Sequence, residues 1–177
     1  MRLSILTILL FGCISFTSAQ ETPKFTINDF GFSNNQDSTR AFIVFVFDGK
    51  NASTLKSSIL SKLSSIYNSP KDVINKIGDN IISIDGYASR VFTYKDEYLC
   101  DILFTMTIEV KDNKVRYNNP VIRKMKMDSG IIGLLDFDEN QTYKIIKEST
   151  DGTNAVLNFF NSLISVLNNS IKKGEDW

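Results

Sequence analysis

The sequence of 177 residues contains no histidine, and this absence excludes several classes of chemistry. Ser-His and Cys-His nucleophilic arrangements need an imidazole as the base, and the common zinc sites use it as a ligand. The sequence also has no phosphate-binding loop and no glycine-rich dinucleotide fingerprint. The remaining catalytic option is carboxylate chemistry, and we expect no cofactor.

A long apolar run occurs only at the N-terminus, where the chain has the parts of a secretory signal. Arg2 supplies a positive charge, residues 3–16 are apolar, and residues 17–19 (TSA) form a small-residue cleavage site. We therefore expect residues 1–19 to be removed on export to the periplasm, the cell envelope or the medium. The alternative is a lipoprotein, because the run LFGC ends at Cys13, which would then carry the lipid. After residue 19, no stretch approaches the ~20 apolar residues of a membrane-spanning helix.

The sequence also has no excess of charge of either sign, because 20 basic residues balance 20 acidic ones. This balance gives no general attraction to nucleic acid or to an anionic membrane, so we expect neither as a partner. Loss of the signal would leave Cys100 as the single cysteine, and an internal disulfide could then not form. Cys100 is one of the apolar residues that occur at every second position from residue 100 to residue 110, which predicts a buried and inert thiol.

The clearest structural pattern lies in residues 98–117. Apolar residues occur at every second position from Cys100 to Val110, and the residues between them are polar except Leu103. Such alternation indicates a strand with one buried face. Residues 111–114 (KDNK) favour a tight turn, because Asp and Asn tolerate positive φ. The segment therefore predicts an antiparallel hairpin with a polar outer face.

The other segments complete an α+β pattern, an antiparallel sheet that carries two packed helices. Residues 39–47 are apolar on both parities, which predicts a central strand covered on both faces. Residues 55–67 and 154–171 carry apolar residues at helical spacing and predict the two amphipathic helices. Gly86 is expected at a bulge or a close approach of the backbone. Further strands are expected over residues 73–77, 81–88 and 121–127.

The domain organisation that follows has three parts after the signal. Residues 20–38 form a lead-in strap or edge strand, residues 39–172 a single α+β domain, and residues 173–177 a tail that frays. Roughly 158 residues remain after residues 1–19, a length that suits one domain with its own core.

Residues 73–84, the segment around Gly86 and above all TIEVKDNKVRY at residues 107–117 carry a resemblance to a known family. Over Phe42 to Met125 the chain resembles domain-of-unknown-function family 4468, described as having a TBP-like fold and found in exported proteins of Bacteroidetes. The family often has glycine in the hairpin turn, where this sequence has Asn113. The expected elements follow the order strand, helix, several antiparallel strands, helix. The resemblance supports this fold and contributes no functional residues.

Two features are candidate contact sites for a partner or a ligand. Residues 130–135 (GIIGLL) are an apolar run, which is either a short buried strand or core-packing loop, or an exposed patch. Two aromatic residues of the C-terminal helix would line or flank a groove between that helix and the sheet. The candidate residues are Ile131, Ile132, Leu134, Leu135, Phe159 and Phe160.

Carboxylates offer two weaker candidates. Residues 136–140 (DFDEN) match the first half of a calcium loop, but Gln141 stands at the glycine position and Lys147 at the glutamate position. We therefore expect a solvated acidic turn and no metal site. Asp101 and Glu109, on one strand, are the pair that a hydrolase would use, and we expect them to be ordinary surface charges.

These observations predict an exported, non-enzymatic envelope or secreted binding module. Its partner would be another protein or a small apolar ligand. The alternatives are a carboxylate-dependent hydrolase and a lipid-anchored envelope lipoprotein with a protein-interaction role.

Overall fold

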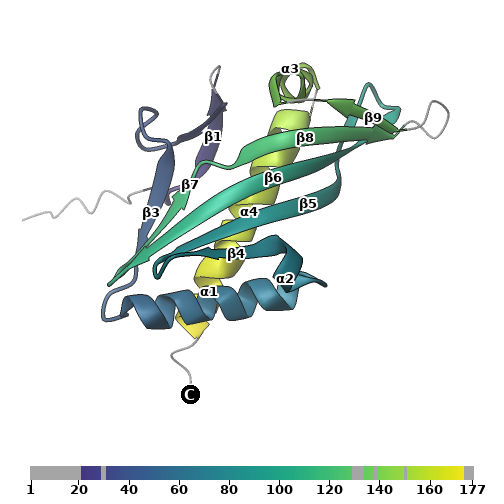
Figure 1. Ribbon diagram of the computed structural model, residues 1–177. Coiled ribbons are helices and arrows are strands. Elements are labelled where there is room, and N and C mark those ends of the chain that lie inside the picture. The colour runs from purple at the N-terminus through teal and green to yellow at the C-terminus, as the bar shows by residue number, and fades with distance from the viewer. Residues whose placement is uncertain (1–20, 29–30, 129–133, 138, 150, 174–177) are drawn as a thin grey trace, which may run out of the picture.

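The computed structural model describes residues 21–28, 31–128, 134–137, 139–149 and 151–173. These residues form a seven-stranded antiparallel sheet, a separate two-stranded hairpin and four helices (Figure 1). The expected signal at residues 1–19, including Cys13, lies outside the described residues. Most of the expected tail, residues 174–177, lies outside them too.

The hairpin predicted at residues 98–117 is confirmed. Strand β6 (Tyr98–Lys111) pairs antiparallel with β7 (Lys114–Asn118). Alternate β6 side chains from Cys100 to Val110 are each at most 1% exposed, so the predicted parity is the buried one. Asn113 adopts φ 62° in the turn, which is a conformation that asparagine tolerates better than most residues.

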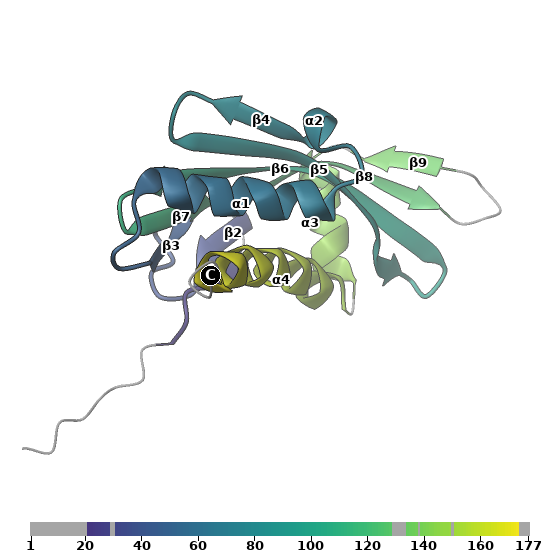
Figure 2. The ribbon, with the colours of Figure 1, turned by 90° about the horizontal axis from the view of Figure 1, so that it is seen from below.

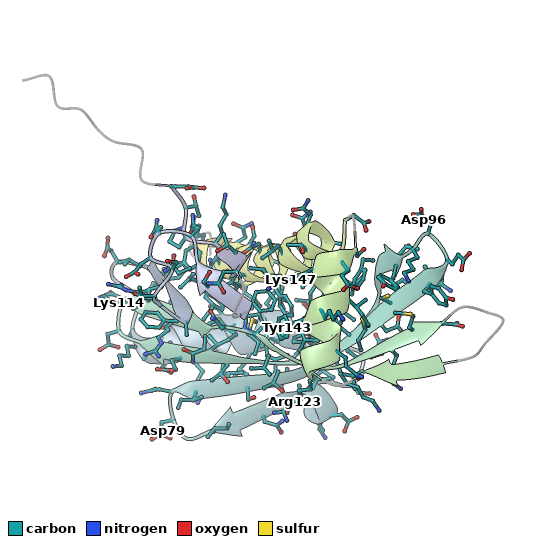
Figure 3. All side chains as sticks on the ribbon, turned by 90° about the horizontal axis from the view of Figure 1, so that it is seen from above. Asp79, Asp96, Lys114, Arg123, Tyr143 and Lys147 are labelled. Carbon is teal, nitrogen blue, oxygen red and sulfur yellow. The ribbon has the colours of Figure 1, made fainter. Side chains whose placement is uncertain are left out.

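The second strand pair is also present, as β4 (Ile74–Ile77) and β5 (Ile81–Tyr94). Gly86 is a close-approach point, because a Cβ there would overlap the ring of Phe104 on the neighbouring strand. The irregularity in the pairing of β5 lies further along, between Ala88 and Phe92. Figure 3 shows the turns around Asp79 and Asp96 at the two ends of β5.

Strand β6 organises the sheet, because it is paired along both edges. Strand β5 runs along one edge, whereas β7 and then β8 (Val121–Asp128) run along the other. Asn119 and Pro120 separate β7 from β8, and β9 (Leu134–Phe137) adds to the outer edge of β8. The strand expected at residues 121–127 is therefore present and lies between β6 and β9, although the sequence favoured an edge segment there.

The expectation of a central strand at residues 39–47 is wrong. Strand β3 (Phe42–Val46) pairs only with β7 and ends the sheet. Its inward parity is buried at Ile43, as a core strand requires. On the outer parity, the guanidinium of Arg116 lies 4.2 Å from the ring centroid of Phe42. A cation thus covers Phe42 on this side of β3, whereas Val46 on the same side is 59% exposed.

Both predicted helices are confirmed. Helix α1 (Ala52–Ile66) begins where the side chain of Asn51 accepts a hydrogen bond from the N–H of Thr54 at 2.8 Å. Helix α4 (Gly152–Lys173) buries its predicted stripe, and α1 and α4 lie side by side under one face of the sheet (Figure 2). The opposite face carries no long helix within the described ranges, and Arg123 points outward there (Figure 3).

Two further helices were not predicted, α2 (Pro70–Val73) and α3 (Glu139–Glu148). The buried face of α3 combines Ile145 and Ile146 with Thr142, and Ser149 is buried directly after the helix. The segment is short and mostly polar, so its few apolar residues do not mark a helix in the sequence as the longer apolar stripes of α1 and α4 do.

The lead-in at residues 20–38 is part of the core. It forms the hairpin of β1 (Phe25–Asn28) and β2 (Gly31–Asn34), and Phe25 is 1% exposed. The rings of Phe32 and Phe160 meet edge to face at 5.2 Å between centroids. Tyr143 of α3 packs on the same hairpin (Figure 3), and its ring centroid lies 6.2 Å from that of Phe32.

Candidate functional site

A large, open and mainly apolar hollow lies between the edge of β5 and the helices α1 and α4, and we call it the β5–α4 groove. Its volume is about 610 Å³. The residues that line it come from the end of α1, from β5 and from one face of α4. They are Ile66, Tyr67, Tyr87, Ala88, Ser89, Arg90, Val91, Ala155, Asn158, Phe159, Ser162 and Leu163.

The groove exists because β5 extends beyond the end of its neighbour β4. Strand β4 pairs with β5 only from Ile81 to Ile84, and no described strand pairs with that edge from residue 85 to residue 94. Helix α1 ends at Ile66, before Pro70, because the residues near a proline leave the helical region. Tyr67 then adopts an extended backbone at φ −98° and ψ 133°, and it forms one end of the groove.

A bulge in β5 shapes the rim. The pairing register between β5 and β6 shifts between Ala88 and Phe92. Within this stretch Arg90 adopts φ 51°, a left-handed conformation that is uncommon for arginine. Asp101 on the adjacent strand holds this conformation, since its Oδ1 accepts the N–H of Arg90 at 2.7 Å. The hydroxyl of Tyr87 donates to the other oxygen of Asp101, and this hydrogen bond raises the pKa of Tyr87.

Helix α4 supplies the apolar wall. Ala155, Phe159 and Leu163 follow one another at four-residue spacing and so lie on one face of the helix. The ring of Phe159 meets Phe104 at 5.5 Å and Phe160 at 5.0 Å between centroids. These contacts fix the ring from behind, so the wall is rigid before any ligand arrives.

Tyr67 adds a partly buried aromatic ring at the other wall. Burial raises the pKa of its hydroxyl, which indicates surroundings less polar than water.

No family model matches the sequence, and no curated protein does. Among solved structures, the chain is similar to a TBP-like protein from Parabacteroides distasonis ATCC 8503, with a TM-score of 0.56 and 11% sequence identity. The match covers 74% of this chain and 90% of that chain. The chain has a TBP-like fold. At this identity the similarity concerns the fold alone.

On this TBP-like fold, the two predicted aromatic residues of α4 have different places. Phe159 lines the groove, whereas Phe160 is fully buried. Tyr67 and Arg90 were not predicted as site residues. Their place depends on where α1 ends and on the bulge in β5, and neither residue has a sequence pattern of its own that signals a site.

Leu134 and Leu135, the described residues of the run 130–135, do not line this groove. Leu134 and Leu135 belong to β9, whose backbone pairs with Asp128 and Met127. Three strand spacings, roughly 14 Å, separate β9 from β5 across the sheet. Ile131 and Ile132 lie outside the described residues.

The carboxylate candidates do not form an active site. Asp101 and Glu109 are eight residues apart on β6, roughly 26 Å along an extended strand, whereas paired catalytic carboxylates lie within about 10 Å. Glu109 accepts a hydrogen bond from Asn118 at 2.9 Å and pairs with Arg116 at 3.6 Å. Each carboxylate therefore has its own structural partners.

The calcium-loop candidate has the wrong backbone. Its first residues end β9 at Phe137, and α3 begins at Glu139, so a strand and a helix occupy the positions that a calcium loop needs. In the part of the chain that the structure describes, no three metal-binding side chains cluster. None of the described helices combines the length and the apolar character needed to cross a membrane.

A second hollow, of about 300 Å³, lies on the other side of α4, beside Phe45 and Phe47 at the β3 edge. The hydroxyl of Tyr117 donates to Asn168 at 2.7 Å, and Asn168 is one of the residues that line this hollow. It is half the size of the β5–α4 groove and has two lysines, Lys24 and Lys172, among its lining residues. The β5–α4 groove is the better candidate for an apolar ligand.

Proposed function

We propose that this chain is an exported, non-enzymatic binding module that takes a small apolar ligand in the β5–α4 groove. The observation that carries the proposal is the groove itself, about 610 Å³ in volume and walled by Tyr67, Val91 and Phe159. This volume falls within the range of small-molecule sites, roughly 300–1,000 Å³. Apolar side chains that line an open groove gain free energy when a ligand removes them from water.

The absence of enzymatic activity is part of the same proposal. The sequence has no histidine to act as a base, and Asp101 and Glu109 serve structural hydrogen bonds far from each other. The hydroxyl and amide groups in the groove, at Ser89, Asn158 and Ser162, have no adjacent acid or base among the lining residues that could activate them.

Export and family membership complete the proposal. The signal at residues 1–19 supports an exported chain, with a lipid anchor at Cys13 as the alternative form. The TBP-like fold supports membership of family 4468, together with the residues 107–117 that carry the resemblance.

The test fills the groove by mutation. Ala155→Trp places a large ring inside it, and Asn169→Trp places the same ring at an exposed position further along the same helix, outside the groove. Titration with the neutral apolar dye Nile red should show saturable binding to the wild type and to Asn169→Trp. Ala155→Trp should lose it, because the ring occupies the space of the dye.

Ser162→Trp provides a second way to fill the groove, since Ser162 is exposed and lines the same wall. Circular dichroism should show that all three variants remain folded. Non-saturable binding to the wild type, or equal binding to every variant, would reject the groove as the site.

A further inference from the structure

The charge at the rim narrows the class of ligand. Arg90 is the only charged residue among the described residues that line the β5–α4 groove, and it is exposed. Its guanidinium takes part in none of the ion pairs described for this structure, such as those of Arg40 and Arg116. A cation beside an apolar groove complements a ligand with an anionic head and an apolar body.

The backbone of Arg90 shows that its position is built into the fold. A left-handed φ of 51° is unfavourable for a residue with a Cβ, and it persists because Asp101 accepts the Arg90 N–H. The other oxygen of Asp101 is engaged by the hydroxyl of Tyr87. Strained residues of this kind cluster at ligand sites, where the surrounding structure holds them in place.

The apolar wall suits an alkyl chain. The α4 residues of the groove run from Ala155 to Leu163, about 12 Å along the helix axis. An elongated apolar wall of this length, with one charged residue at the rim, fits a single acyl chain better than a compact ring system.

Resting on the proposed function, we infer that the ligand of the β5–α4 groove is a free long-chain carboxylate. Its carboxylate pairs with the guanidinium of Arg90, and its alkyl chain lies along Val91 and Phe159. The guanidinium offers two parallel N–H donors to a carboxylate, a geometry that an alcohol cannot match. Each methylene buried on the wall strengthens binding by up to about fourfold.

The experiment compares dodecanoate, dodecanol and dodecyltrimethylammonium by calorimetric titration at pH 7.5 and low salt. Wild-type protein should bind dodecanoate roughly threefold to tenfold more tightly than dodecanol, and the ammonium compound least tightly. The preference should shrink as salt screens the charges. Decanoate should bind more weakly than dodecanoate, since it buries less of its chain.

Three variants test the role of Arg90. Arg90→Gln should abolish the preference for the carboxylate while leaving dodecanol binding unchanged, and Arg90→Lys should retain part of it. Lys71→Gln removes an exposed charge outside the groove and should behave as the wild type does. A merely structural role for Arg90 would instead weaken all three ligands together.

The remaining outcomes separate this inference from the proposed function. Equal affinity for dodecanoate and dodecanol would overturn the inference and leave the apolar groove in place as the site. Failure of all three ligands to bind would reject both. Arg90-dependent binding to vesicles of anionic phospholipid, with no binding of free dodecanoate, would replace the free carboxylate with a membrane surface.

Discussion

Asn161 of α4 holds the backbone of Phe25 by two hydrogen bonds, one to each polar group of the residue. Its Oδ1 accepts the Phe25 N–H at 2.8 Å, and its Nδ2 donates to the Phe25 carbonyl at 3.1 Å. The side-chain amide thus acts on β1 as a neighbouring strand would. This pair explains how a lead-in segment that precedes the sheet by many residues becomes part of the core.

The first prediction concerns this pair. Asn161→Ala leaves two backbone groups of Phe25 without their partner and should lower the free energy of unfolding by about 1–3 kcal/mol. Asn169→Ala, at an exposed position of the same helix, should cost about 0.5 kcal/mol or less. Urea denaturation measures both, and equal losses would mean that the hairpin is not fastened through Asn161.

The second prediction concerns the β6 register. Phe104 is 1% exposed and packs against the rings of Phe159 and Phe160, so Phe104→Ala should cost about 3–5 kcal/mol. Thr105 faces the open side and hydrogen-bonds Asp85 and Arg123, so Thr105→Ala should cost about 1 kcal/mol or less. A reversed order of the two losses in urea would contradict the register.

The third prediction concerns backbone strain at Arg90. Glycine adopts φ 51° without a Cβ penalty, whereas alanine keeps that penalty. Arg90→Gly should therefore be more stable than Arg90→Ala by about 1 kcal/mol, as measured by thermal or urea unfolding. Both variants should lose the preference for a carboxylate ligand. Greater stability of the alanine variant would show that the bulge is not strained.

The fourth prediction concerns pH. Burial raises the pKa of the Cys100 thiol to about 11 from 9.0, so the folded state disfavours the thiolate. The resulting stability is fully present below pH 9 and is lost as the pH rises towards 11, because the unfolded chain then releases its proton more readily. Native protein at pH 8 should react with a thiol reagent far more slowly than unfolded protein.

The Cys100→Ala variant isolates this contribution. Burial of Tyr117 raises its pKa as well, so the wild type loses stability at high pH for two reasons. Between pH 9 and 11 the wild type should lose more stability than Cys100→Ala does. Parallel pH profiles for the two proteins would show that the thiol is not protected.

The fifth prediction concerns export. Intact-mass analysis of protein recovered from the envelope or the medium should give a chain that begins at Gln20, with or without cyclisation to pyroglutamate. A mass that corresponds to a lipid-modified Cys13 would replace soluble export by the lipoprotein alternative.

Much of the fold follows from local patterns. The alternation from Cys100 to Val110 is enough to predict both the strand and its buried face, because successive side chains of a strand point to opposite sides. The apolar stripes of α1 and α4 are likewise enough to predict both helices, since apolar residues at helical spacing form a face that must be buried. Asn51 marks the start of α1 for the same local reason, through a hydrogen bond within one turn.

The groove could not be predicted in this way, because it depends on contacts between elements that are distant in the sequence. Tyr67, Arg90 and Phe159 belong to different segments of the chain. They line one groove only because β5 extends beyond β4 and because α1 ends beside α4. The sequence determined which face of β6, α1 and α4 is buried, since side-chain polarity carries that information. Only the tertiary structure decided which strands are neighbours and which edges stay open, because backbone hydrogen bonds are nearly the same for every residue and leave no mark in the sequence.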